Sequence, residues 1–269
     1  MRYGVLSDIH GNLHALTAVL ERLRSEGVDA FLCAGDLVGY GPLPNECVET
    51  IAQLPGVCVA GNHELLALGR LPTDRCGNLA RLTLDWTRNA LREDACRYLS
   101  ALPVRAEAPG GVVLTHASLD DPQQYIRDPS EAAAQLDLLA AEHPLASTLI
   151  IGHTHRSWVC GRRAGTLPIP RDGQVRLQPG QPYLLNPGSV GQSRYRERVP
   201  RARCLLLDLD QGRATFYALA YDVESCRREL RRQGLPERSY HVPGSWRRSA
   251  AHRLRSLVRR TIARTSGSG

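Results

Sequence analysis

The chain has 269 residues, 42% of them hydrophobic and 23% charged, with a formal net charge of +7. This composition excludes a disordered chain, and no run of eighteen apolar residues is present that could span a membrane. The length suits one large α/β core, or one domain with an appendage. The apolar run that opens the sequence is too short for a signal peptide and leads into an acid, so we expect a cytoplasmic protein. None of the eight cysteines forms a C-x-x-C pair, and we expect thiols in a reducing compartment.

The first half of the chain alternates short apolar runs with helical patterns. In chain order it predicts strands at residues 2–7, 30–35, 57–61, 111–115 and 147–151, and helices at about 12–25, 76–102 (one long helix or a pair) and 130–142. Asp8, Asp36 and Asn62 follow the first three strands at steps of 28 and 26 residues. Such steps suit strand-helix-strand crossovers, which make neighbouring strands parallel.

After His155 the sequence pattern changes to short apolar runs separated by glycine and proline. These runs, at residues 157–161, 165–170, 173–177, 181–186, 203–209 and 213–219, predict antiparallel strands and hairpins. The fold class that follows is α/β: a four-layer αββα sandwich of two mixed β-sheets flanked by helices.

Positive charge is concentrated towards the C-terminus. Residues 1–193 hold 16 Arg against 20 acidic residues, whereas residues 194–269 hold 18 Arg against 7. We therefore predict a main domain over 1–222, a basic helical extension over 223–264 and a disordered tail over 265–269. Within the extension, one apolar helical face opposes arginines; it comprises Trp246, Ala250, Leu254, Leu257, Val258 and Ile262. This face either docks on the domain, which we favour, or leaves the arginines to bind nucleic acid or an anionic membrane surface.

Polar residues lie at or just beyond the ends of five predicted strands. They are Asp8, His10, Asp36, Asn62, His116, His153 and His155. Because the carboxyl ends of parallel strands meet at one edge of a sheet, these distant segments are expected to converge on one site.

The residue types define the chemistry of that site. Four histidines and three oxygen ligands exceed the needs of one tetrahedral ion but suffice for two ions that share a carboxylate. Mixed imidazole and carboxylate ligands favour Mn, Fe or Zn over Mg or Ca, and we expect Mn²⁺ first. Two such ions, about 3.5–4 Å apart, clamp the attacking and leaving oxygens of an in-line displacement and activate the bridging hydroxide. The sequence therefore predicts phosphoester hydrolysis.

Five ordered blocks carry a family resemblance. They are Asp8-Ile9-His10, Gly35-Asp36, Gly61-Asn62-His63-Glu64, His116, and Gly152-His153-Thr154-His155. In this order they resemble the calcineurin-like metallophosphoesterases, in particular the small prokaryotic branch that includes phosphodiesterases and diadenosine-tetraphosphatase relatives.

The resemblance implies a role for each block. Asp8, His10 and His155 would hold the first metal, and Asn62, His116 and His153 the second, with Asp36 as the bridge. His63 would donate the proton to the leaving group or bind a phosphoryl oxygen, and Asn62 would help to orient the phosphate.

One block departs from the protein phosphatases, which carry G-D-x-V-D-R-G. Here Gly39 and Tyr40 replace the Asp and Arg of those relatives. We therefore expect a nucleotide-type phosphodiester or phosphomonoester as substrate. A dinucleoside polyphosphate hydrolase or a protein Ser/Thr phosphatase is the alternative, and a non-catalytic binding scaffold is the rival from another class. Tyr40 either lines the pocket or simply packs against neighbouring residues. Arg194, in a glycine-rich loop, either binds phosphate or only forms part of a turn. The oligomeric state has no signal in the sequence.

Overall fold

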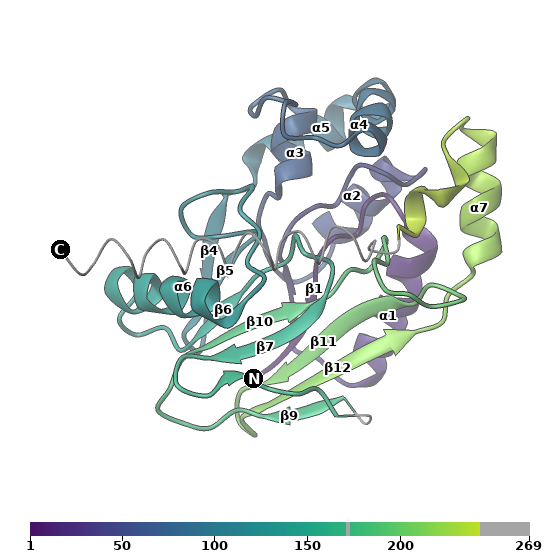
Figure 1. Cartoon of the computed structure of the whole chain (residues 1–269). Coiled ribbons are helices and arrows are strands. Elements are labelled where there is room, and N and C mark those ends of the chain that lie inside the picture. Colours follow the sequence, from purple (N-terminus) through teal and green to yellow (C-terminus); the bar gives the residue numbers. More distant parts are fainter. Residues whose placement is uncertain (171–172, 243–269) are drawn as a thin grey trace.

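Two six-stranded mixed sheets lie face to face in the computed structural model, which describes residues 1–170 and 173–242 (Figure 1). The strand orders are β3-β2-β1-β11-β12-β9 and β4-β5-β6-β10-β7-β8. The strands are β1 (Arg2–Leu6), β2 (Ala30–Cys33), β3 (Gly56–Cys58), β4 (Arg105–Ala108), β5 (Val112–Thr115), β6 (Thr148–Ile150), β7 (Ser157–Gly161), β8 (Gly165–Thr166), β9 (Gln174–Arg176), β10 (Tyr183–Pro187), β11 (Ala202–Asp208) and β12 (Arg213–Leu219).

Helices cover the outer faces of both sheets, as the sequence predicts. They are α1 (Leu13–Ser25), α2 (Pro44–Ala52), α3 (Asn62–Ala67), α4 (Asn78–Ala90), α5 (Glu93–Ala101), α6 (Pro129–Glu142), α7 (Val223–Arg232) and the 3₁₀ turn η1 (Glu237–Tyr240). The predicted segment 76–102 is a helix pair, α4 and α5. In Figure 1 these two lie with α3 at one end of the sandwich.

The first three strands run parallel because a helix crosses over between each pair. β1 pairs with β2 and β2 with β3, both in parallel. The first crossover helix, α1, begins at Asn12, whose side chain accepts a hydrogen bond from the Ala15 amide at 3.2 Å. Its buried stripe includes Leu16, Val19 and Leu23, at the spacing of one helical face, and packs in the same cluster as β11.

The main core lies between the two sheets. Val5 and Leu205 come from the first sheet, Leu114, Ile150 and Leu185 from the second, and all five are fully buried. The tight packing of these side chains between the sheets holds the strand ends of both sheets at fixed relative positions.

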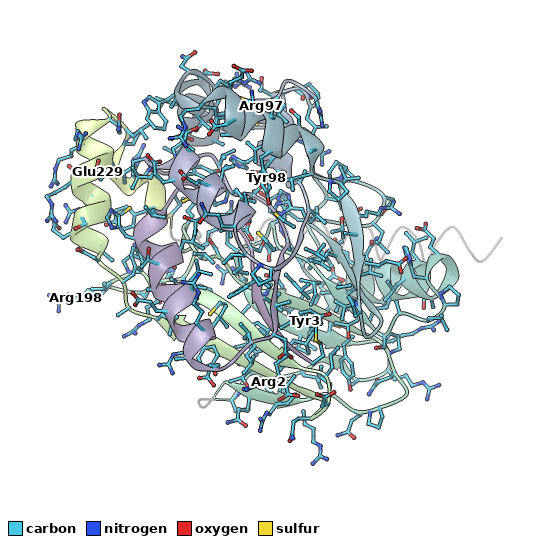
Figure 2. All side chains as sticks on the ribbon, turned by 180° about the vertical axis from the view of Figure 1, so that it is seen from behind. Arg2, Tyr3, Arg97, Tyr98, Arg198 and Glu229 are labelled. Carbon is cyan, nitrogen blue, oxygen red and sulfur yellow. The ribbon has the colours of Figure 1, made fainter. Side chains whose placement is uncertain are left out.

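The view from behind shows how the outside differs from this core (Figure 2). Arg97 and Glu229 lie on the outer helices α5 and α7, whereas the side chain of Tyr3 in β1 is buried between the sheets, with 2% of its surface exposed. The Tyr3 hydroxyl donates to the Pro109 carbonyl at 3.0 Å, which joins β1 to the β4–β5 turn of the other sheet.

The second half of the chain departs from the sequence prediction in two respects. Most of its strands are antiparallel, as predicted, but β10 pairs in parallel with β6 and antiparallel with β7. The predicted strand at 165–170 shrinks to the two residues of β8. Prolines at 168 and 170 explain the short strand, because proline has no N–H to donate to a ladder.

The first part of the predicted basic extension is helical. α7 packs against α1, and Cys226, Leu230 and Leu235 form a small buried cluster under it. The predicted amphipathic helix at 245–264 and the tail at 265–269 lie outside the described residues. All eight cysteines are free thiols. In the described ranges, no helix combines the length and apolar character needed to cross a bilayer.

Candidate metal centre

The strand ends of both sheets present polar residues to one site. Asp8 and His10 follow β1, Asp36 follows β2, and Asn62 and His63 form the first turn of α3 after β3. From the second sheet come His116 after β5, and His153 and His155 after β6. The convergence predicted from sequence is therefore present, with both sheets contributing.

An unusual backbone conformation accompanies this convergence. Six non-glycine residues have φ between 50° and 63°: Asp8, His10, Asp36, Tyr40, His153 and His155. L-residues rarely adopt this left-handed region, and it persists only where the surroundings hold it. Backbone bonds hold two of them, because the Asp8 amide donates to the Gly35 carbonyl and the His10 amide to the Asp36 carbonyl, both at 2.9 Å.

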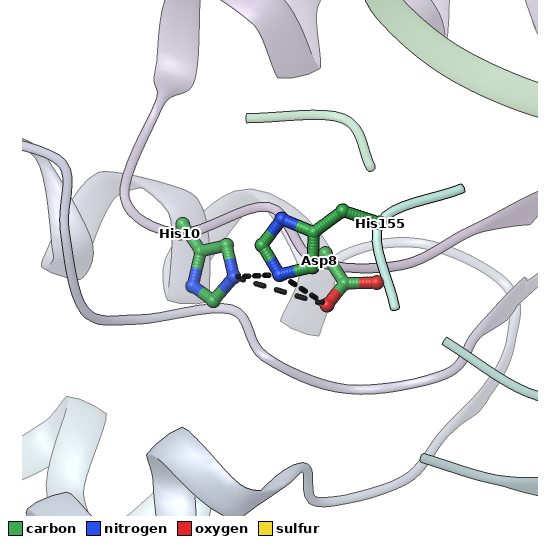
Figure 3. Close-up of side chains that lie close together, drawn as sticks. All are labelled: Asp8, His10 and His155. Atoms are coloured by element: carbon green, nitrogen blue, oxygen red, sulfur yellow. Dashed lines mark hydrogen bonds and ion pairs between the residues drawn. The ribbon is translucent and has the colours of Figure 1, made fainter. Parts of the chain in front are cut away.

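The first group of ligand atoms consists of Asp8, His10 and His155 (Figure 3). His155 Nε2 lies 3.1 Å from Asp8 Oδ1 and 3.2 Å from His10 Nε2. The two Nδ1 atoms face backbone carbonyls, that of His10 at 3.0 Å from Val38 O and that of His155 at 2.8 Å from Gln192 O. These carbonyls hold the Nδ1 protons, which leaves both Nε2 atoms free to bind a metal.

The second group consists of Asp36, His116 and His153. Asp36 Oδ2 lies 3.2 Å from His116 Nε2 and 3.7 Å from His10 Nε2 of the first group. His116 Nδ1 is 2.6 Å from the Ala34 carbonyl, so Nε2 is again the free nitrogen. In His153 the roles reverse, because Nε2 faces the Gln123 carbonyl at 3.3 Å and Nδ1 is left for a ligand.

Asn62 and His63 lie between these groups and the pocket. Both are more than nine-tenths buried, and neither Asn62 Oδ1 nor His63 Nδ1 has a hydrogen-bond partner. The His63 amide donates to Asp36 Oδ1 at 2.9 Å. The His63 ring lies 4.8 Å from that of His10 and 4.9 Å from that of Tyr40. Because His10, Asp36 and His63 also form a compact group, His63 is close enough to act on a ligand held there.

Burial sets the protonation of the histidines. It lowers the pKa of His63 and His155, and lowers those of His10 and His153 well below the usual range. Burial therefore favours the neutral imidazole, which is the form in which His10, His153 and His155 can bind a metal. His116 differs: burial opposes its charge, yet the Asp36 and Asp8 carboxylates raise its pKa to about 10.

The two carboxylates are ionised despite burial. Desolvation disfavours their charge, but His155 and His116 hold the pKa of Asp8 below its ordinary value, and His116 and His63 hold the pKa of Asp36 well below it.

Glu64 has a structural role that the sequence prediction left open. Its carboxylate accepts four backbone N–H bonds of 2.7 to 3.1 Å, from Asp36, Leu37, Val38 and Gly61. Burial and the nearby Asp36 charge raise the pKa of Glu64 to about 7. By binding both the Asp36 turn and the start of α3, Glu64 fixes Asp36 relative to Asn62 and His63. The sequence signal for this role was that Glu64 directly follows Gly61-Asn62-His63.

The open side of the site is a pocket of about 560 Å³, part of it open to solvent. Its lining residues are Asp36, Tyr40, Asn62, His63, Arg75, Cys76, Gly77, Ala80, Gln123, Tyr125, His153, His155 and Arg194. Tyr40 and Arg194 lie there as pocket-lining residues. Position 39, where the protein phosphatases carry an aspartate, has no room for a side chain here. A Cβ on Gly39 would lie 2.2 Å from His63 Nδ1, and the φ of Gly39 is +84°, which favours glycine. Arg75 and Tyr125 line the pocket without a recognisable sequence signal.

Comparisons with known proteins bear on the family and the fold of this chain. Residues 1–172 match the family model of calcineurin-like phosphoesterases. An uncharacterised protein of Methanocaldococcus jannaschii is 30% identical over 238 residues, which cover 87% of this chain and 93% of that protein. The crystal structure of a metallophosphoesterase from Sphaerobacter thermophilus is 33% identical with a TM-score of 0.75, over 89% of this chain and 96% of that one. A hypothetical protein from Pyrococcus horikoshii OT3, at 20% identity and TM-score 0.71 over 89% and 96%, shares the fold. The chain therefore belongs to the calcineurin-like phosphoesterase family.

Proposed function

We propose that the protein hydrolyses a phosphodiester or phosphomonoester of nucleotide type with two bound metal ions. The observation that carries this proposal is the pair of ligand groups, Asp8-His10-His155 and Asp36-His116-His153, lying side by side. Asp36 Oδ2 lies 3.2 Å from a histidine of one group and 3.7 Å from a histidine of the other. A carboxylate in that position suits a bridge between two ions.

The residues present fit such ions. Asn62 Oδ1 is buried without a hydrogen-bond partner, and buried polar groups normally have one. Asp8 Oδ1 and His116 Nε2 also make no well-aligned hydrogen bond, and each faces another candidate ligand, His155 or Asp36, at 3.1 and 3.2 Å. Metal ions would satisfy them, with Asn62 joining the second group. Imidazole and carboxylate together favour Mn²⁺, with Fe or Zn as alternatives.

The protein's own side chains would supply the remaining chemistry. Metal ions at this site would provide a Lewis acid for the phosphoryl oxygens and an activated water. His63 lies close enough to a ligand held there that its imidazole, once protonated, would donate that proton to the leaving oxygen and return to the neutral form. Asn62 and Arg194 would orient the phosphate, and Tyr40, whose ring packs against His10 and His63, would shape the pocket wall.

The pocket wall supports the proposed substrate class. At Gly39 and Tyr40 the chain lacks the Asp and Arg of protein phosphatases, which favours a small ester over a phosphoprotein. Two arginines, Arg75 and Arg194, line the pocket beside two tyrosines, Tyr40 and Tyr125. Guanidinium groups bind phosphate oxygens, and aromatic rings accommodate a base or another flat leaving group.

Metal removal and a substrate panel test the proposal. Exhaustive chelation should abolish hydrolysis, and Mn²⁺ should restore it with about two ions per chain by elemental analysis. Rates on bis-p-nitrophenyl phosphate, p-nitrophenyl phosphate, cyclic nucleotides, dinucleoside polyphosphates and a phosphopeptide would rank the substrate classes. Full activity in a chelated, metal-free protein would contradict the two-metal proposal, and a preference for the phosphopeptide would favour the phosphatase alternative.

A further inference from the structure

The loop between β5 and α6 reaches into the pocket with Tyr125. The Tyr125 ring stacks on the His153 ring with the centroids 4.0 Å apart and the planes inclined by 26°. The guanidinium carbon of Arg127 lies 4.0 Å from the centre of the same ring. The Tyr125 ring therefore packs against both Arg127 and His153, and His153 is a candidate metal ligand.

The same loop fixes His153 in a second direction. Gln123 O faces His153 Nε2 at 3.3 Å, which holds the ring by its edge. That carbonyl also accepts a hydrogen bond from Arg75 Nη2 at 3.2 Å, while Arg75 Nη1 pairs with Asp121 at 3.2 Å. The edge contact leaves the imidazole free to tilt about it, and the Tyr125 stack opposes that tilt.

Tyr125 also lies beside the candidate phosphate-binding arginine. Both Tyr125 and Arg194 line the pocket. Burial opposes the charge of the Arg194 guanidinium, but interaction with the Tyr125 side chain raises its pKa. Arg194 Nε also donates a 3.4 Å bond to Gln192 Oε1, and among residues 1–170 and 173–242 no carboxylate forms a salt bridge with Arg194. The Tyr125 hydroxyl is therefore placed to restrain where the Arg194 guanidinium lies.

We propose that Tyr125 is a positioning residue with two separable actions. Its ring holds His153 in the orientation that ligates metal, and its hydroxyl holds Arg194 in the orientation that binds substrate phosphate. This inference rests on the proposed function and adds to it a residue that lies outside the five ordered sequence blocks.

Two substitutions separate the actions. Tyr125→Phe keeps the stack and removes the hydroxyl, so Mn²⁺ binding should stay within twofold of wild type while KM for bis-p-nitrophenyl phosphate rises about three- to tenfold with little change in kcat. Tyr125→Leu removes the ring, and the affinity for the more weakly held Mn²⁺ should fall about 10- to 100-fold, as for other groups that orient a ligand. Calorimetric titration of the metal-depleted full chain with Mn²⁺ measures the affinities independently of activity.

Tyr217 provides the matched control, because Arg22 lies over its ring at 5.4 Å and it is not a pocket residue. Tyr217→Leu should leave both Mn²⁺ affinities and KM unchanged. Wild-type Mn²⁺ affinity in a folded Tyr125→Leu protein, or an unchanged KM in Tyr125→Phe, would overturn the inference while leaving the proposed function standing. If Tyr125→Leu does not fold, the Tyr125→Phe result decides. A wild-type protein that binds none of Mn²⁺, Fe²⁺ and Zn²⁺ would instead remove the proposed function itself.

Discussion

His63 is placed to act on a leaving group, yet it also lies within reach of two candidate ligands. Its amide is bonded to Asp36, its ring contacts that of His10, and its Nδ1 lacks a partner. A general acid and a metal ligand would respond differently to removal of the imidazole, so the two roles can be distinguished.

We expect His63→Ala to lower kcat by about 10²–10⁴-fold on an ester with a poor leaving group, since that is a typical general-acid contribution. Metal content should remain near that of the wild type. Asp36→Asn serves as the contrast and should lose metal, because Asp36 joins the two ligand groups. Elemental analysis beside steady-state kinetics makes the comparison. An empty site in His63→Ala, or an unchanged rate, would make the role assigned to His63 wrong.

At this scale the sequence predicted the polar residues that converge but not the groups that support them. Asp8, Asp36 and His116 each follow an apolar strand, and the carboxyl ends of parallel strands meet at one edge of a sheet. Tyr125 and Arg75 come from loops without periodicity, so no pattern relates them to the site. Their contacts depend on how two loops fold over the pocket, which is a tertiary property.

At the scale of elements, local pattern predicted parallel strands wherever a helix crosses over, and β1, β2 and β3 confirm this. The parallel pairing of β10 with β6 had no such signal, because thirty-odd residues and three intervening strands, β7, β8 and β9, separate them. α3 was also hidden, since its six residues begin inside the Gly-Asn-His block and are too few to show a helical period.

The loop that carries Arg194 is held to β11 by an ion pair. Glu197 accepts two bonds from Arg203, at 2.8 and 2.9 Å, and one from the Ser193 hydroxyl. Burial opposes ionisation of Glu197, but Arg203 and Ser193 lower its pKa to about 2. Arg203 also lies 3.6 Å from the centre of the Tyr195 ring. The loop thus has a rigid base just beyond Arg194.

This pair should make part of the stability pH-dependent. Because the folded-state pKa of Glu197 is depressed, its stabilisation is present above its ordinary pKa of about 4.5 and is lost as the pH falls towards 2. Glu197→Gln should therefore lower the melting temperature at pH 7 and show a smaller loss than wild type between pH 4.5 and 2.5. Glu93→Gln is the control, because Glu93 pairs with Arg97 on an exposed helix surface. Equal acid sensitivity of Glu197→Gln and wild type would show that the ion pair does not stabilise the loop.

At the scale of the whole molecule, an acidic first part carries the candidate site and a strongly basic C-terminal part follows it. The described end of the chain returns to the loop of Arg194: Val242 N donates to Ser193 O at 3.0 Å, and His241 Nε2 faces Tyr195 O at 3.0 Å. A truncation intended to test the basic segment must therefore keep residues up to Val242, or it would also disturb the pocket.

The predicted helix over 245–264 can be tested by ending the chain after Val242. If the face that includes Trp246, Leu254 and Leu257 docks on the domain, as we favour, the truncated protein should melt at a lower temperature, because each buried large apolar side chain contributes about 1.5–3 kcal/mol. Turnover of small substrates should barely change, since the contacts of Ser193 with residues 241 and 242 remain. If the arginines instead bind a polyanion, melting should be unaffected, and binding to RNA or to anionic vesicles should weaken and lose its steep salt dependence. Calorimetric melting and a salt series of binding measurements on full-length and truncated protein separate docking from polyanion binding. An unchanged melting temperature together with lost salt-sensitive binding would show that docking is the wrong choice. The basic segment would then bind a charged partner.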